Sequence, residues 1–288
     1  MSARHVLAIA RLTVREAMRR RVLWVLFSLS VGSVAIVAVG VDRLVDSARA
    51  QGMDEVQVRI GVSQVLILIA FMFSFVLAMS AAFLGAPAIA SDVESGSVLA
   101  ILARPTSRAD LIVGRWLGLS VVVVAYVALS GVLAIAAVGL VSGHVPPEPA
   151  LAVAYLAGES VLVLTVALML GTRLASVAAG AISVVLFALS WFAGVLGALA
   201  ASLDVPTLRT WTDAVRLVMP TDVLWRGVVY GLEPPLVVLL SQGRRIAALD
   251  ANPFFASAPP PAGLVVWAVA WVVLTLLGAL LLFRRREL

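Results

Sequence analysis

The feature that most constrains this chain is Gly61–Ser91, a run of 31 uncharged residues. A bilayer core of roughly 30 Å is crossed by about 20 helical residues. The run is therefore long enough to span a membrane with tilt or with an extension beyond it. A membrane β-strand would alternate apolar and polar residues, which this run does not do. A helix satisfies its own backbone hydrogen bonds in lipid, so the run predicts a membrane-spanning helix.

Similar apolar stretches recur along the chain. The 288 residues are 62% hydrophobic and 13% charged, whereas a soluble domain is about half apolar and a quarter charged. We therefore predict an all-α, polytopic membrane protein with about six transmembrane helices and a single transmembrane domain over residues 1–288. The predicted spans are Val22–Val41, one within Gly61–Ser91, one within Trp116–Gly143, Ala150–Thr172, one within Leu174–Leu203, and Gly263–Phe283.

Residues 2–21 predict an amphipathic interfacial helix and not a cleavable signal, because charges run through the whole segment. At 100° per residue its charged face and its apolar face separate cleanly. Such a helix suits the headgroup region of a membrane, with its arginines facing anionic lipid. The charged face carries Arg4, Arg11, Arg15 and Arg19, and the opposite face carries Val6, Ile9, Ala10, Val14 and Ala17.

The distribution of arginine predicts the orientation, since short cytoplasmic flanks are enriched in basic residues. The N-terminal segment has six arginines, the 92–115 connector three, the fourth-to-fifth connection one and the C-terminal tail three. The alternate flanks are less basic. Residues 42–60 contain three arginines and four acidic residues, and residues 144–149 contain no arginine. Both termini are therefore predicted to lie in the cytoplasm, which requires an even number of spans.

Two connections between spans are longer than simple turns. Residues 42–60 are predicted to form a mixed-charge loop. Residues 204–258 are predicted to be extracytoplasmic and to contain short outer-leaflet or re-entrant helices, because proline and charged residues break the apolar stretch 217–242 into short pieces. The alternative for 217–242 is a pair of half-spans.

The residue inventory excludes several functions. All 21 basic residues are arginine, and a P-loop needs a lysine that reaches the nucleotide phosphates, so the chain is predicted not to be an ATPase. Cysteine is absent, which excludes thiolate metal sites and iron–sulfur clusters. His5 and His144 are expected to be solvated surface residues. We predict no catalytic residue, no cofactor site and no metal site in this chain.

One acidic residue lies inside a predicted span. Glu159 is near the middle of the fourth span, where an acid costs on the order of 3 kcal/mol. It is either a contact for substrate or protons that faces a cavity, or a side chain hydrogen-bonded to another helix. Glu159 is thus a candidate residue of the substrate path.

The most informative stretch is the connector Ser91–Gly118, which predicts a cytoplasmic helix–turn–helix. Asp92 and Glu94 favour a helix N-terminus, and Pro105 ends the helix. A short helix that projects from a span can dock in the groove of another protein. The alternative is an interfacial loop without a partner.

This connector resembles the cytoplasmic segment of type-2 ABC exporter permeases. The resemblance rests on Glu94-x-Gly96, then Leu99 and Leu102, then Arg104-Pro105-x-Ser107-Arg108, and then Gly114-Arg115-x-x-Gly118. The family usually has lysine where this chain has Arg115. Met219-Pro220-Thr221-Asp222 also resembles the Asn-Pro-x-Asp element of a subgroup associated with nitrous oxide reductase maturation, with Met219 in place of asparagine.

The resemblance implies a permease subunit without its own ATPase site, whose coupling segment 91–116 contacts a separate ATP-binding subunit that binds the ATP. A second permease copy, as a homodimer, would complete the transporter. No nucleic-acid partner is expected, and the implied location is the bacterial inner membrane, with export as the direction. The candidate coupling residues are Asp92, Glu94, Gly96, Arg104, Pro105 and Arg108.

The alternative to a permease is a membrane anchor or scaffold that holds a partner complex without transport. Spans rich in leucine, valine and alanine fit several classes of substrate. Only seven methionines are present and there is no cysteine, which counts against direct copper transport because soft metals prefer sulfur ligands.

Overall fold

The structure of the chain is a computed structural model that describes residues 2–19, 21–95, 107–203, 205–235, 237 and 252–286. Every regular element within these residues is a helix, which confirms the predicted all-α fold. The six long helices are α2 Arg21–Ala50, α3 Glu55–Gly85, α6 Arg108–Ser142, α7 Pro149–Gly171, α8 Ser176–Ser202 and α13 Ala262–Arg284. The shorter helices are α1 Ala3–Arg19, α4 Pro87–Glu94, α9 Pro206–Val218 and α10 Thr221–Leu232.

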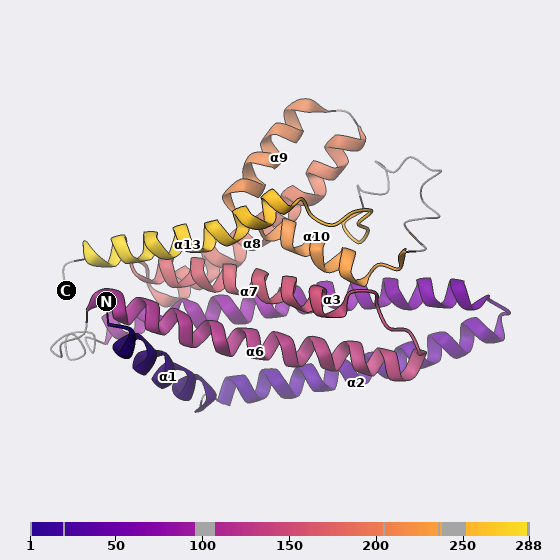
Figure 1. The fold of residues 1–288 in the computed structure, drawn as a ribbon, viewed down its shortest axis with the longest axis horizontal. Helices are drawn as coiled ribbons and strands as arrows, with labels where there is room; N and C mark the ends of the chain where they lie inside the picture. The colour runs from indigo at the N-terminus through magenta and orange to yellow at the C-terminus, as the bar shows by residue number, and fades with distance from the viewer. Residues whose placement is uncertain are drawn as a thin grey trace.

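Six helices of the described chain are long and apolar enough to cross a membrane, α4 continuing the span of α3, which confirms the predicted number of spans. The two ends of the chain lie at the same end of this bundle (Figure 1). The backbone N–H of Ser2 donates to Asp110 Oδ1 at 3.2 Å, and Arg108 donates to the carbonyl oxygen of Phe283 at 3.1 Å. We call this the terminal end of the bundle and the opposite end the far end.

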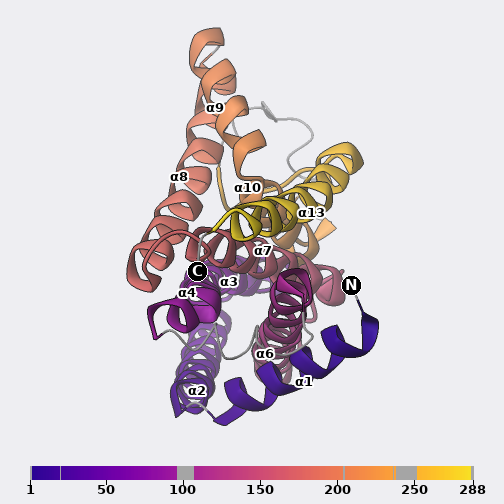
Figure 2. The same cartoon turned by 90° about the vertical axis from the view of Figure 1, so that its left-hand side faces the viewer.

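Helix α7 forms the centre of the bundle. Figure 2 shows it surrounded by α3, α6, α8 and α13. The most apolar window of α7 is 67% buried, compared with 22% for the α2 span and 17% for α13. The protein core therefore lies around α7. Helices α2 and α13 are peripheral, because most of the residues in their apolar windows are not buried.

Small residues allow α3 to approach α7 closely. A Cβ atom placed on Gly85 would lie 2.6 Å from the carbonyl oxygen of Leu164, and one placed on Gly171 would overlap the carbonyl oxygen of Ala86. Interfaces between membrane helices are enriched in such small residues, because close approach of the backbones increases the van der Waals packing that helps to drive helix association. This contact lies next to Pro87, where the α3 span continues into α4.

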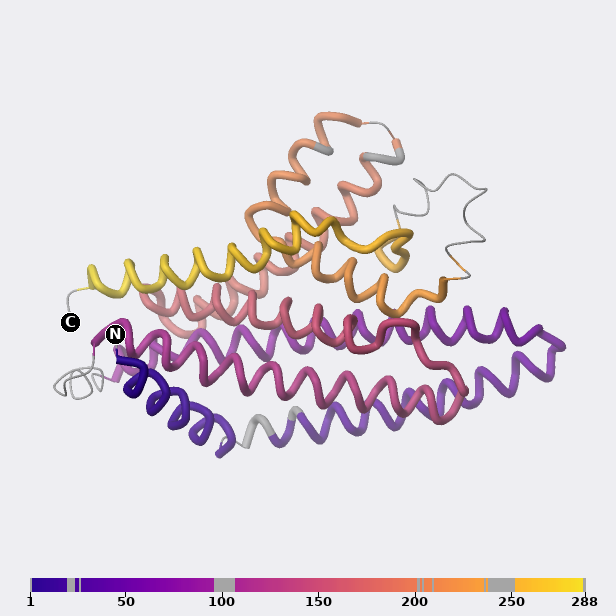
Figure 3. Tube along the Cα trace, in the orientation of Figure 1, coloured from indigo at the N-terminus to yellow at the C-terminus, as the bar shows by residue number. Residues whose placement is uncertain are grey.

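Helix α1 slants across the terminal end of α6 (Figure 3). Its predicted polar face is correct, because Arg4, Arg11, Arg15 and Arg19 are all exposed. Its apolar face packs in part on protein. Gly114 and Gly118 of α6 leave room for Ile9 and Thr13, whose Cβ atoms would each be 2.7 Å from an added Cβ. The two glycines of the connector motif thus seat α1 on α6.

The predicted loop 42–60 is wrong in extent. Helix α2 continues to Ala50 and α3 begins at Glu55, so only residues 51–54 connect them. The helical period explains the difference, because Val41 and Val45 are buried one turn apart and face Val58 and Val62 of α3. Figure 1 shows that this hairpin extends beyond the other helices at the far end.

Helices α9 and α10 are the predicted short helices before the last span. Helix α9 packs back along α8, where Gly197 faces Thr212, and its junction with α10 lies against Gly194. Helix α10 then runs antiparallel to α7, with contacts that join Leu224 to Gly158, Gly227 to Tyr155, and Gly231 to Ala152. The junction therefore lies beside the middle of α7, and α9 and α10 form a hairpin that packs on α8 and α7.

Candidate functional site

The candidate site is at the terminal end, where the connector joins the spans. Asp92 lies in the last turn of α4 and its carboxylate is paired with the Arg115 guanidinium of α6. Both side chains are largely covered, at 15% and 14% exposed. Asp92 and Glu94 fall in the last turn of α4, which begins at Pro87, while the predicted connector helix that follows them and ends at Pro105 lies outside the described residues.

Glu94 joins α4 to another span. Its Oε1 accepts a hydrogen bond from the backbone N–H of Ser176 at 3.1 Å, at the first residue of α8. The first N–H groups of a helix have no partner within the helix, and an acid there is favoured by the helix dipole. Glu94 therefore caps α8, although Glu94 and Ser176 are 82 positions apart in the chain.

Arg108 holds the end of the last span. Its Nη1 donates to the carbonyl oxygens of Phe283, Arg284 and Arg286 at 3.1, 3.1 and 2.8 Å. Its Cζ is 5.8 Å from the centre of the Phe283 ring. A cation is stabilised at a helix C-terminus, where carbonyl groups are unpaired. Arg108 therefore binds α6 to the last turn of α13.

Two further arginines complete these connections. Arg173 donates to the carbonyl oxygen of Leu282 at 2.8 Å, and Arg286 donates to the carbonyl oxygen of Thr172. In the sequence, Arg173 indicates only the orientation of the chain. The three other candidate coupling residues, Gly96, Arg104 and Pro105, lie outside the described residues. The described candidates thus link α4 to α6 and α8, and α6 to α13.

Glu159 is buried in the centre of the bundle. It is 3% exposed, and its Oε2 accepts a hydrogen bond from Ser74 Oγ of α3 at 2.8 Å. Of the two readings of this residue, the hydrogen bond to another helix is observed. A serine hydroxyl satisfies a carboxyl group whether or not it is protonated.

A second charged cluster lies at the α9–α10 junction and was not predicted. Asp222 is 4% exposed, and its Oδ2 lies 2.6 Å from Arg216 Nη2 and 3.5 Å from Arg226 Nε. Gly194 of α8 packs directly against this carboxylate. In the sequence these charges mark only breaks in an apolar stretch. Their common position becomes clear once α9 and α10 fold against each other.

The far end also buries titratable groups. Gln64 donates to Glu233 Oε1 at 3.1 Å, and burial raises the pKa of Glu233 to about 7. The prediction that His144 is solvated is wrong, because this side chain is 8% exposed. Its burial, together with the positive charge of Arg59, lowers the pKa of the imidazole. The α6–α7 connection that carries it folds against the helices instead of extending into solvent.

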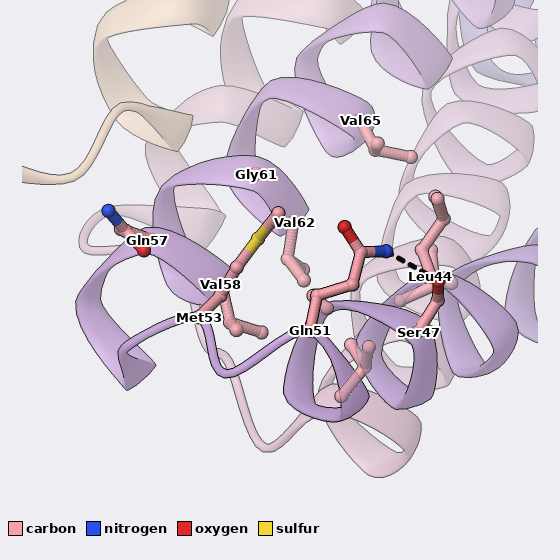
Figure 4. A pocket seen from close by; sticks show the side chains of 12 residues that line it. Leu44, Ser47, Gln51, Met53, Gln57, Val58, Gly61, Val62 and Val65 are labelled. Atoms are coloured by element: carbon pink, nitrogen blue, oxygen red, sulfur yellow. Dashed lines mark hydrogen bonds between the residues drawn. The ribbon is translucent and has the colours of Figure 1, made fainter.

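No group of three His, Cys, Asp or Glu side chains comes together among the described residues. A cavity of about 250 Å³ lies between α2 and α3 at the far end, and most of its lining is apolar (Figure 4). Gln51 faces it but donates to Ser47 Oγ at 3.1 Å.

Comparison with known proteins agrees with this geometry. A family model described as ABC-2 family transporter protein matches residues 7–288. No curated protein matches the chain. The match extends over the bundle, the connector and the α9–α10 hairpin, and it confirms the family resemblance predicted from the connector motif. The chain therefore belongs to the ABC-2 transporter family and is a membrane permease component of an ABC transporter.

Proposed function

We propose that this chain is one of two identical permease subunits that export a substrate across the bacterial inner membrane with ATP hydrolysed by a separate subunit. The ATP-binding subunit would contact segment 91–116. The ATP itself would be bound by that subunit, since the permease has no lysine for a P-loop. Residues 1–288 would act as one permease domain.

The observation that carries the proposal is the set of links around segment 91–116. Glu94 caps α8, Asp92 pairs with Arg115 of α6, and Arg108 caps α13. A partner that moves this segment would therefore displace the ends of three spans together. Each link is a hydrogen bond or ion pair that involves a charged group, and such interactions are stronger than hydrogen bonds between neutral groups. Such links suit the transfer of a mechanical change from a bound subunit into the bundle.

The charge of the terminal end supports a cytoplasmic location. The arginines of α1 are exposed there, and Arg173 and Arg284–Arg286 lie at the same end. Cytoplasmic flanks of membrane proteins are enriched in such residues. In this orientation α1 would lie at the inner surface with its charged face toward anionic headgroups.

The peripheral spans leave room for a second copy. Helices α2 and α13 bury the smallest fractions of their apolar windows among the six candidate spans. Lipid and a second subunit would share this uncovered surface. Glu159 is proposed as a residue of the substrate path, because a buried acid in a span is costly to keep without a function.

Co-purification with the proteins encoded beside this chain tests the proposal. We expect an ATP-binding subunit to co-purify, and its ATP hydrolysis to rise when both are reconstituted in vesicles. The matched variants are Glu94→Gln, which removes the charge that caps α8, and Glu55→Gln, at an exposed far-end residue.

Glu94→Gln should keep the complex assembled and lower the stimulated hydrolysis severalfold, and Glu55→Gln should leave both unchanged. Arg104→Gln should behave as Glu94→Gln does. If no ATP-binding subunit co-purifies and hydrolysis is the same without the permease, the proposed coupling is refuted. A scaffold would instead assemble without any effect on hydrolysis.

A further inference from the structure

We propose that the cavity between α2 and α3 at the far end holds one acyl chain of a phospholipid at the membrane surface. The cavity has a volume of about 250 Å³ and is enclosed by the two helices of the α2–α3 hairpin (Figure 4). All of its lining residues belong to the described part of the chain. The cavity lies at the opposite end from the segment proposed to contact the ATP-binding subunit, so the inference does not rest on ATP-driven transport.

The cavity is long and narrow. Its lining follows one face of each helix, at positions 41, 44, 45 and 48 of α2 and 58, 61, 62 and 65 of α3. At 1.5 Å per residue, each face extends over about 10 Å. A volume of about 250 Å³ over at least that length gives a cross-section of at most about 25 Å². A partner helix, about 10–12 Å in diameter, is too wide for this space, whereas a single hydrocarbon chain fits it.

The chemistry of the lining favours an uncharged, apolar group. None of the lining residues, all of which the structure describes, is charged. The polar ones are engaged within the hairpin. Gln51 Nε2 donates to Ser47 Oγ at 3.1 Å, and Gln57 Oε1 accepts from the backbone N–H of Asp54 at 3.3 Å. A ligand would therefore be held mainly by the burial of apolar surface.

The cavity begins where α2 and α3 leave the membrane. Asp42 is the first charged residue after the uncharged run of α2, and Arg59 is the last one before the uncharged run of α3. Both are exposed. Charged side chains are costly in hydrocarbon, so these two mark the bilayer surface. The lining continues past both of them toward the loop at residues 51–54, which places most of the cavity beyond the hydrocarbon core.

Apolar side chains are open to solvent beside this cavity. Val41 and Val45 are 1% and 3% exposed and form part of its floor, but Leu44 and Met53 of the same lining are 54% and 45% exposed. Exposed apolar surface at the height of charged residues indicates a binding site. The adjacent bilayer is the nearest source of apolar chains. A chain that rises from it would cover Leu44 and Met53 while its headgroup stays in water.

Photolabelling of the full chain in phosphatidylcholine vesicles tests the proposal. The probe is a phosphatidylcholine with a diazirine at the end of one acyl chain, and mass spectrometry identifies the labelled peptides. Chain ends in an undisturbed bilayer lie near its midplane. Label within residues 42–59 therefore reports a chain that has entered the cavity. Helix α13, whose apolar window is only 17% buried, provides the reference for ordinary contact with lipid.

Two glycines provide matched variants. Gly61 lines the cavity, and a Cβ added there meets nothing within 4 Å, so Gly61→Leu fills the cavity without a clash. A Cβ added to Gly40 also meets nothing within 4 Å, but Gly40 is not part of the lining. Gly40→Leu is therefore the control for the added side chain and for the gain in helix propensity. The melting temperature of each variant shows whether it is folded.

We expect Gly61→Leu to lower the labelling of residues 42–59, relative to α13, at least about tenfold, because the new side chain displaces two or more CH₂ groups of the lipid. Gly40→Leu should leave the labelling unchanged. The same photoreactive chain on phosphatidylglycerol should label equally well, since no lining residue is charged. Equal labelling in the two variants, or a strong preference for one headgroup, would overturn the assignment to an acyl chain. Wild-type protein without label in residues 42–59 would also overturn it, and weaker dimers of Gly61→Leu in native mass spectrometry would then identify a second copy as the occupant.

Discussion

The close contact between α3 and α7 gives the sharpest prediction of stability. In Gly85→Ala, the new Cβ would lie 2.6 Å from the Leu164 carbonyl oxygen and 3.0 Å from Leu164 Cδ1. A C–H group and a carbonyl oxygen are normally at least about 3.3 Å apart. One helix must therefore move by roughly 0.7 Å relative to the other. A backbone oxygen cannot rotate away as a side chain does, so the shift involves the helix itself.

The expected cost is that of an overpacked core, about 1–3 kcal/mol. The replacement also raises helix propensity by up to about 1 kcal/mol, since glycine is a poorer helix former than alanine. Gly40→Ala is the matched control, because Gly40 is also inside a helix and an added Cβ there meets nothing within 4 Å. Both variants gain the same helix propensity, so it cancels when their free energies of unfolding are subtracted. The remaining difference should be about 1–3 kcal/mol.

Reversible unfolding in mixed micelles, followed by tryptophan fluorescence, gives the free energy of unfolding of both variants. Gly85→Ala should be less stable than the wild type, and Gly40→Ala equal to it or more stable. If the two alanine variants have the same free energy of unfolding, the reasoning is refuted, because the α3–α7 contact would then not limit packing.

Three further predictions follow from charged groups. Asp222→Asn should lower the free energy of unfolding by about 2–4 kcal/mol, slightly less than for a fully buried pair because the arginines are 22% exposed; equal unfolding curves would contradict this. Glu233 keeps a proton in the folded state that the unfolded chain releases above about pH 4.5. The free energy of unfolding of the wild type should therefore fall as pH rises from about 4.5 through 7. The melting temperatures measured at pH 5 and pH 8 should differ less in Glu233→Gln than in the wild type. Arg108→Gln should speed hydrogen exchange of the last turn of α13 about tenfold, with α7 unchanged as the internal control.

The spans of this protein could be predicted from the sequence because membrane crossing is a local property. About 20 consecutive apolar residues suffice to identify a span, whatever they pack against. Gly61–Ser91 and the other runs therefore gave the right number of spans. The boundaries were less accurate at residues 42–60, where alternating charges concealed a helix that continues to Ala50.

The candidate site was only partly predictable for the same reason. The motif located Asp92, Glu94 and Arg108 in the connector, but each contacts a residue far away in the chain. Glu94 and Ser176 are 82 positions apart, and Arg108 and Arg286 are 178 positions apart. Hydropathy and spacing contain no information about which helix ends meet, so these capping contacts required the fold.

The sequence by itself determined that the chain is an all-α membrane protein of six spans without a P-loop, because span length, polarity and the absence of lysine are properties of the residues alone. Only the tertiary structure decided the path of α9 and α10. These helices have 13 and 12 residues, too few to be recognised as membrane segments. Their depth is set by packing of the junction on Gly194 and of α10 on α7, and that packing brings Arg216, Asp222 and Arg226 together.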